Sequence, residues 1–265
     1  MPISTTDKMI AEKDGAIGWI TFNNPERRNA VSMAMWEGLH AIVSDYAADD
    51  AIRVIVVKGA GDKAFVSGAD ISEFEQRRSS PETTRIYGET SGRASEALRL
   101  VGKPTIAMIR GFCIGGGVSV ATSCDLRIAE EGARFGVPAA RLGLGYEFAG
   151  VRKLVDIVGP SYAKEIFYTA RQFSAAEAQA MGLVNRVVPA DRLEAFVREY
   201  AGMIAENAPL TVASIKTLVG QVVEDESQRD MNLCKAVVDR CFQSLDYVEG
   251  RTAFMEKRKP VFRGR

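Results

Sequence analysis

The sequence predicts an α/β fold followed by a helical C-terminal region. Two short apolar segments each end in a glycine-containing turn that leads into a helix-forming segment, one at residues 64–71 and one at residues 103–125. From about residue 149 onwards, helix-forming segments dominate, separated by glycine and proline. This order indicates an α/β core, which we place at residues 1–200, and a helical region at residues 201–265.

The first elements are predicted from turn and capping residues. Asp14-Gly15 separates two apolar runs, residues 9–13 and 16–22, and this dipeptide is a strong signal for a β-hairpin. Ser32 can cap a helix that runs from residue 33 to about residue 47. We therefore expect a hairpin followed by a helix.

The next elements complete the predicted core. Residues 54–59, VIVVKG, predict a strand of the kind that is buried on both faces. A long helix is expected at residues 83–101, and it leads into a strand at residues 104–109. Two further short strands are expected at residues 125–129 and 134–136.

Charge and hydropathy exclude several classes of function. The chain of 265 residues carries 34 basic and 34 acidic residues, which leaves no electrostatic footprint for nucleic acid. No apolar run approaches the roughly 18 residues that a membrane helix needs. The first residues also lack the basic segment and apolar core of a signal peptide. We expect a cytoplasmic protein that binds neither nucleic acid nor membrane.

The cysteines and the single histidine do not indicate metal or nucleophilic chemistry. Cys113, Cys124, Cys234 and Cys241 lack CxxC spacing, and we expect buried free thiols in a reducing compartment. His40 falls within the first predicted helix and is interpreted as structural, which argues against Ser-His-Asp catalysis. No ligand cluster predicts a metal site.

The glycine-rich turn at Gly115 to Gly117 predicts an anion or oxyanion site. Consecutive glycines allow positive φ or close approach of the main chain, and a helix that begins at Gly116 would direct free N–H groups at a ligand. A tight turn against a neighbouring strand would also use glycines. The similar turn at residues 66–69 favours the oxyanion interpretation, because donors from two turns can converge on one oxygen.

The order and spacing of seven motifs resemble the crotonase family, the enoyl-CoA hydratase/isomerase group. Each motif is weak alone, but together they cover the chain from about residue 8 to its end. They are NPERRNAVS (24–32), AFVSGADI (64–71), GFCIGGGVS (111–119), CDLRIA (124–129), FGVPAARLGL (135–144), GLVNRVV (182–188) and AFMEKRKPVF (253–262).

The resemblance implies a fold, an assembly and a ligand. The fold would be a spiral of ββα units with a C-terminal helical trimerisation region, and the protein would be a homotrimer or a dimer of trimers. The substrate would be an acyl-CoA or enoyl-CoA thioester, with no other cofactor. The oxyanion donors would be the backbone N–H groups of Ser67 and Gly116.

The resemblance also implies the path of CoA. Residues expected to bind it are Arg27, Arg28, Ala30, Ser67, Asp70 and Ile71, together with Phe254 and Lys257 from a neighbouring subunit. Asn29 would lie on the same path. The CoA phosphates give Arg27 and Arg28 a ligand, although a solvated charge pair is the alternative.

Two departures from the family pattern bear on the reaction. Hydratases of this family use two glutamates, and the matching positions here hold Ser119 and Ala139. Alanine cannot transfer a proton, and serine without a base is a poor acid–base group. Glu147 falls where isomerases and dehalogenases of the family carry an aspartate, with Tyr146 as a hydrogen-bonding neighbour, and its alternative role is to cap the following helix.

The sequence therefore favours isomerase-type chemistry with Glu147 as the acid–base group. Enoyl-CoA hydration by a modified site, decarboxylation and C–C hydrolysis of an acyl-CoA remain alternatives. A CoA-thioester binding protein without catalysis is an alternative of a different class.

Overall fold

The computed structural model describes residues 6–70 and 80–265. The strands are β1 (Met9–Asp14), β2 (Ile17–Phe22), β3 (Val54–Gly59), β4 (Ala64–Val66), β5 (Thr105–Ile109), β6 (Phe112–Ile114), β7 (Leu126–Glu130), β8 (Arg134–Gly136), β9 (Phe173–Ser174) and β10 (Arg186–Val188). The helices are α1 (Met33–Ala48), α3 (Pro81–Leu100), α4 (Gly116–Ser123), α5 (Ala139–Leu142), α6 (Phe148–Thr169), α7 (Ala175–Ala180), α8 (Leu193–Ala205), α9 (Pro209–Val222), α10 (Met231–Phe242) and α11 (Leu245–Glu256).

The strands form two sheets that are connected in a repeating way. The larger sheet has the order β1-β2-β3-β5-β7-β10, and the smaller has the order β4-β6-β8-β9. In three successive pairs, β3–β4, β5–β6 and β7–β8, the first strand joins the larger sheet and the second joins the smaller one. Within each sheet these strands pair in parallel. This is the predicted spiral of ββα units, and the α/β fold class is confirmed.

The predicted hairpin and first helix are confirmed. The strands β1 and β2 pair antiparallel, with Met9 opposite Phe22. The Ser32 side chain accepts a hydrogen bond from the Met35 amide and so caps α1. The expectation of a doubly buried strand at β3 is also correct, because Ile55 and Val57 face one hydrophobic cluster whereas Val54 and Val56 face another.

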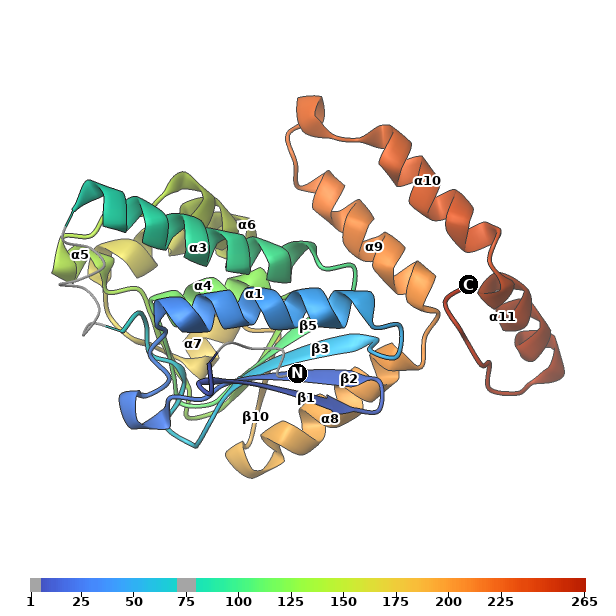
Figure 1. Ribbon diagram of the computed structural model, residues 1–265, viewed down its shortest axis with the longest axis horizontal. Coiled ribbons are helices and arrows are strands. Elements are labelled where there is room, and N and C mark those ends of the chain that lie inside the picture. Colours follow the sequence, from blue (N-terminus) through green and yellow to red (C-terminus); the bar gives the residue numbers. More distant parts are fainter. Residues whose placement is uncertain (1–5, 71–79) are drawn as a thin grey trace.

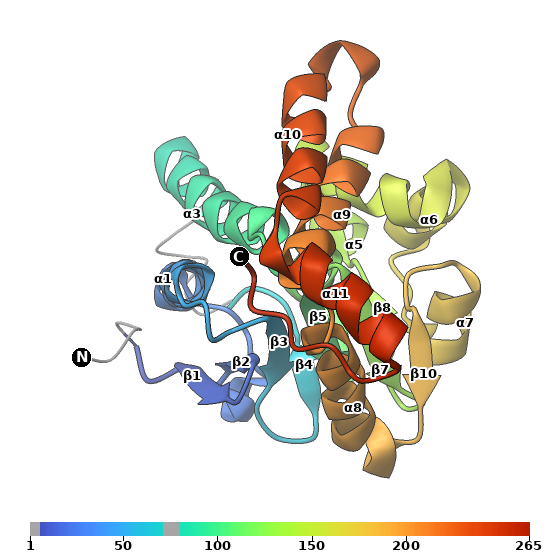
Figure 2. The same ribbon diagram turned by 90° about the vertical axis from the view of Figure 1, so that its right-hand side faces the viewer.

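Helices cover both faces of the larger sheet (Figures 1 and 2). The main cluster includes side chains of α1 and α3, and the second cluster is closed by Leu193, Val197 and Ala201 of α8. The predicted boundary at residue 200 falls within α8, so the helical region that leaves the core begins after Ala205.

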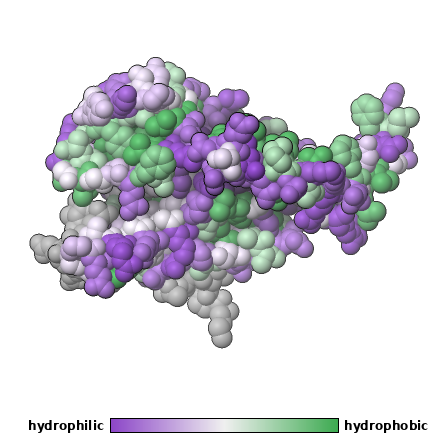
Figure 3. Space-filling view, turned by 90° about the horizontal axis from the view of Figure 1, so that it is seen from above, coloured by the Kyte–Doolittle hydropathy of each residue, from purple (hydrophilic) through white to green (hydrophobic). Residues whose placement is uncertain are grey.

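The helices α9, α10 and α11 extend away from the core as an arm (Figure 1). Its surface carries many exposed apolar side chains, which Figure 3 shows in green at the right of the view. They include Ile215, Val219, Val222, Met231, Phe242, Leu245, Phe254 and Met255. Among the described residues, no helix combines the length and the apolar character that crossing a membrane requires.

The cysteines differ from one another in burial. All four are free; Cys113 and Cys124 are buried, as expected, whereas Cys234 and Cys241 on the arm are only half-buried. The expectation of four buried thiols was therefore half correct, because the arm does not pack into the core. Burial raises the pKa of the Cys124 thiol to about 12 and also raises that of Cys113, so neither is a nucleophile near neutral pH.

Candidate active site

The two predicted glycine-containing turns meet in the structure at one cavity of about 380 Å³. The first turn follows β4 and contributes Ser67, Gly68 and Ala69 to the wall. The second follows β6 and contributes Gly115 and Gly116. A Cβ atom on Gly116 would lie 3.7 Å from the Ala69 nitrogen, so the turns are in direct contact.

Glycine is required in the second turn for two reasons. Gly115 is the N-cap of α4 and has φ of 54°, which favours glycine. A Cβ atom on Gly117 would lie 2.1 Å from the Val66 carbonyl oxygen, so only glycine allows α4 to begin against β4. These contacts place the N-terminus of α4 beside the first turn.

The prediction that the Ser67 amide donates to an oxyanion is wrong. The Ser67 amide donates a hydrogen bond to the Arg28 carbonyl at 3.1 Å and is therefore not available to a ligand. The Ser67 hydroxyl donates to the Arg27 carbonyl at 3.3 Å. Ser67 fixes the loop at residues 27–28 to the first turn, and its own side chain remains part of the cavity wall.

The Ala69 amide is the donor that the first turn presents. A parallel bridge with Val31 uses the Gly68 carbonyl, which accepts from the Val31 amide at 2.9 Å, and the Asp70 amide, which donates to the Val31 carbonyl at 3.0 Å. In such a bridge the intervening Ala69 N–H faces the opposite way. Within the described part of the chain, the amides of Ala69 and Gly116 donate no hydrogen bond, so both are available to one oxygen atom.

Glu147 lies in the same cavity. It is the N-cap residue of α6, but its side chain makes no capping hydrogen bond, which removes the alternative role considered from the sequence. A Cβ atom on Gly88 of α3 would lie 3.2 Å from the Glu147 Oε1 atom, so the carboxylate reaches across to α3. No ion pair with another described residue engages this carboxylate.

The aromatic neighbours of Glu147 differ from each other. Tyr146 lines the cavity and packs edge-on against Phe167, with ring centroids 4.9 Å apart. Phe148 is 79% exposed and does not pack in the core. Glu147 therefore has an aromatic residue of the cavity wall on one side and an exposed aromatic side chain on the other.

The positions of the two absent glutamates are also in this cavity. Ser119 and Ala139 both line it. Trp36 and Tyr87 form another part of the wall, where the indole N–H donates to the Tyr87 hydroxyl at 3.0 Å. Among the described residues of the wall, Glu147 and Lys153 are the only charged ones, and the sequence analysis did not identify Lys153.

The loop predicted to bind CoA is held by the buried side chain of Asn29. Its Nδ2 group donates to the carbonyls of Ala60 and Ala64, at 2.9 and 2.7 Å, and its Oδ1 atom accepts from the Asn24 amide at 2.9 Å. These bonds stabilise a positive φ of 55° at Asn29. The loop is thereby fixed beside β4.

Most of the predicted CoA residues lie near the first turn. Arg27 forms an ion pair with Asp70 at 3.0 Å, and Asp70 directly follows Ala69. The Arg28 guanidinium lies over the Phe112 ring, 5.3 Å from its centroid. Ala30 is buried, with 9% of its surface exposed. Arg28 is exposed, and its carbonyl accepts a hydrogen bond from the amide of Ser67 in the cavity wall.

The other predicted CoA residues are not brought to the cavity within this chain. Phe254, which is 83% exposed, and Lys257 lie at the end of α11 on the arm, far from α3 and α5 (Figure 1). Ile71 lies outside the described residues. Whether a neighbouring subunit supplies Phe254 and Lys257 stays a prediction.

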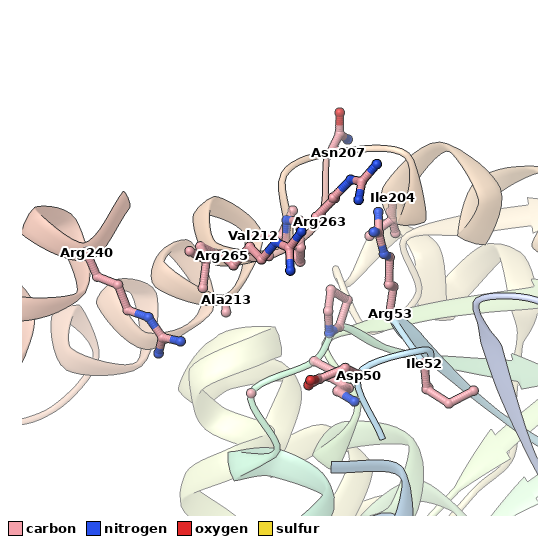
Figure 4. Close-up of a pocket in the computed structure, with 16 residues that line it drawn as sticks. Asp50, Ile52, Arg53, Ile204, Asn207, Val212, Ala213, Arg240, Arg263 and Arg265 are labelled. Atoms are coloured by element: carbon pink, nitrogen blue, oxygen red, sulfur yellow. The ribbon is translucent and has the colours of Figure 1, made fainter. Parts of the chain in front are cut away.

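A second cavity of about 450 Å³ lies where the arm leaves the core (Figure 4). Basic side chains line it, but two of them donate to main-chain carbonyls: Arg53 to Ala205 and Phe262, and Lys103 to Tyr46 and Asp49. The bond from Arg53 to Phe262 joins the segment that follows α11 to the core, whereas the Lys103 bonds lie within the core. The smaller cavity, which combines two free amides and a carboxylate, is therefore the candidate active site.

The chain matches one protein family over nearly its whole length. The enoyl-CoA hydratase/isomerase family model matches residues 12–265. A short-chain-enoyl-CoA hydratase of Clostridium acetobutylicum is 34% identical over 253 residues, which cover 96% of each chain. A crotonyl-CoA hydratase of Syntrophomonas wolfei is 35% identical over 256 residues, covering 97% of this chain and 98% of that protein.

Solved structures agree with this assignment. The crystal structure of an enoyl-CoA hydratase/carnithine racemase from Magnetospirillum magneticum has a TM-score of 0.93 and 35% identity, and covers 99% of this chain and 98% of that one. A putative enoyl-CoA hydratase/isomerase family protein from Hyphomonas neptunium has the same score and identity, with 99% and 100% covered. The chain described here therefore belongs to the enoyl-CoA hydratase/isomerase family of the crotonase superfamily.

Proposed function

We propose that this protein is an isomerase that moves a double bond along the acyl group of an enoyl-CoA thioester. The thioester oxygen would accept hydrogen bonds from the amides of Ala69 and Gly116. Glu147 would remove a proton from the carbon next to the thioester and return it two carbons further along. The observation that carries the proposal is that Glu147 is the only carboxylate among the described residues of the cavity wall.

The two amides supply the electrostatic part of the mechanism. Removal of the proton creates an enolate, whose negative charge develops on the thioester oxygen. Main-chain donors already aimed at that oxygen need no reorganisation, and loss of one such donor typically raises the barrier by about 3–4 kcal/mol. The dipole of α4, which begins at Gly116, adds to this stabilisation.

One carboxylate suits isomerisation because the same group can remove and return the proton. Hydration in the two-glutamate manner would need a second acid–base group, and Ser119 and Ala139 stand at the positions concerned. Water addition remains the second candidate, and the names of the two hydratase relatives favour it. In that case Glu147 alone would activate the water. The proposed reaction uses no group beyond the CoA thioester.

Substitution of Glu147 by glutamine tests its role. Glutamine keeps the size of the side chain but cannot accept a proton at neutral pH, so turnover should fall by about 10²–10⁴-fold. Affinity for a saturated acyl-CoA, measured by calorimetry, should stay within about twofold. Glu199→Gln on the exposed face of α8 is the matched control. Unchanged turnover in Glu147→Gln would show that the reaction uses another group.

The CoA path and the assembly form a further part of the proposal. We propose that CoA lies along Arg27, Arg28 and Ala30, with its adenine end closed by Phe254 and Lys257 of a second copy in a homotrimer or a dimer of trimers. The exposed apolar side chains of the arm support this assembly, because a large apolar surface is unfavourable in water.

A further inference from the structure

Lys153 places a positive charge in the wall of the acyl cavity. It lies on α6, and only 20% of its side chain is exposed. An ammonium group so far removed from water is costly unless polar partners replace its hydration. The partners of Lys153 within the chain therefore indicate whether a ligand is needed to complete its environment.

These partners are few. Lys153 Nζ donates to the Ser123 Oγ atom at 3.3 Å. Its nearest carboxylate oxygen, on Glu96, is 4.0 Å away. That carboxylate already accepts two hydrogen bonds from Arg99, at 2.9 and 2.6 Å, which hold the pKa of Glu96 below its usual value. Arg99 thus balances the charge of Glu96. Burial lowers the pKa of Lys153, and the charge of Glu96 offsets this effect only in part.

The α3 wall of the same cavity is made of small residues, several of which carry a hydroxyl group. Residues of α3 that face the cavity recur at helical spacing: Thr84, Gly88, Ser91, Gly92 and Ser95. The hydroxyls of Ser95 and Ser119 donate no hydrogen bond within the described part of the chain. A purely aliphatic acyl group would strip water from these groups without replacing its hydrogen bonds.

The distance from the two amides sets the length of the group that can reach Lys153. Ser123 follows Gly116 by seven residues in α4, which corresponds to about 10 Å along the helix axis. Lys153 Nζ, in contact with Ser123, is therefore about two helical turns from the site of the thioester oxygen. An extended acyl chain of roughly six to eight carbons spans this distance.

We propose that Lys153 binds a carboxylate at the far end of the acyl group, so that the preferred substrate is a dicarboxylic acyl-CoA thioester of medium length. The hydroxyls of Ser95 and Ser119 can donate further hydrogen bonds to oxygen atoms of the acyl group. This inference rests on the proposed function, since it places the thioester at Ala69 and Gly116. It adds the chemical class of the acyl group.

Calorimetry with saturated thioesters tests the inference without any turnover. The matched pairs are adipoyl-CoA with hexanoyl-CoA, and suberoyl-CoA with octanoyl-CoA, each pair having the same number of carbons. We expect the wild-type protein to bind the dicarboxylic member of a pair about 10–100-fold more tightly, as befits one charge-assisted contact. In Lys153→Met the preference should disappear, whereas Lys164→Met, at an exposed lysine of α6 beyond the kink at Gly159, should retain it.

The outcomes separate this inference from the proposed function. Equal binding of both members of each pair by the wild-type protein overturns the carboxylate site and leaves the enoyl-CoA function standing. A preference that survives in a folded Lys153→Met variant overturns the role of Lys153. Failure to bind any of the four thioesters overturns the proposed function itself. If Lys153→Met does not fold, Lys153→Arg should keep the preference, and its loss in a folded Lys153→Arg counts against the site.

Discussion

The side chain of Asn29 holds the loop at residues 27–30 and the first turn in place, and its removal should lower the stability of the fold. Asn29→Ala leaves the carbonyls of Ala60 and Ala64 and the Asn24 amide without their partner in a buried site. We expect a loss of about 2–4 kcal/mol in the free energy of unfolding. Urea denaturation measures it. Asn23→Ala, which removes one exposed bond to Asp7, should cost less than about 1 kcal/mol.

Gly117 should tolerate no side chain. In Gly117→Ala the new Cβ atom would overlap the Val66 carbonyl, so α4 must move away from β4. We expect a loss of about 1–3 kcal/mol in stability and at least a tenfold fall in turnover, because the Gly116 amide moves with the helix. In Gly202→Ala, where the space around the new Cβ atom is open, stability should rise by about 0.5–1 kcal/mol. Equal behaviour of the two variants would contradict this account.

Individual donors were harder to predict from the sequence than the turns that carry them. The glycines at 115–117 and Gly68 located both turns, and Gly116 was assigned correctly to the first residue of α4. The family resemblance placed the other donor at Ser67, whose amide instead donates to the Arg28 carbonyl. Only the bridge between Val31 and Ala69 determines which amides of that turn face the cavity, and this pairing is not visible in the local sequence.

At the scale of elements, the capping box of α7 provides a pH-dependent contribution to stability. The Ser174 amide and hydroxyl and the Arg171 guanidinium donate to Glu177 and lower its pKa to about 2 from the ordinary 4.5. A lowered folded-state pKa stabilises the fold above about pH 4.5, and this stabilisation is lost as the pH falls towards about 2.

Glu177→Gln should therefore be less stable than the wild-type protein at neutral pH. Urea denaturation between pH 7 and about pH 3 should show the difference shrinking below about pH 4.5, because the unfolded chain then takes up a proton at Glu177 whereas the folded carboxylate stays ionised. A difference that stays constant over this range would show that the charge of Glu177 does not contribute.

Elements with strong local signals were predicted well, and the others were not. Asp14-Gly15 and Ser32 mark the hairpin and the start of α1 through turn and capping chemistry. The three-residue strand β6 was missed because it follows β5 after only two residues and has no alternation of its own. The cavity face of α3 was also missed. Its small polar residues recur at helical spacing, but only the position of α6 across the cavity identifies this face as a cavity wall.

At the scale of the whole molecule, the arm should join copies of the chain. Val222 on α9 is 70% exposed. We expect light scattering to give three or six times the chain mass of 28.8 kDa. Val222→Asp should shift the distribution towards the monomer, whereas Tyr168→Asp, at a 74% exposed position on α6, should leave the mass unchanged. A monomeric wild-type protein would contradict the proposed assembly.

The fold class of the whole molecule was predictable because its signal is distributed over the whole chain. Each of the seven motifs was a weak signal alone, but their order was specific for the fold. The alternation of strands between two sheets confirms that fold. The boundary between core and arm was harder to predict from the sequence. The helix α8 has the same local character as the arm helices, and only its contact with the sheet assigns it to the core.

The central claim is that the cavity stabilises a thioester enolate and moves one proton through Glu147. Mass analysis of the products formed from matched 2-enoyl- and 3-enoyl-CoA thioesters in deuterated water tests it most directly. The panel should include dicarboxylic and monocarboxylic acyl groups. The account predicts a shifted double bond without added water, and deuterium in the product wherever Glu147 exchanges its proton with the solvent before returning it. Addition of water to the 2-enoyl thioesters, with no shift of the double bond, would contradict it.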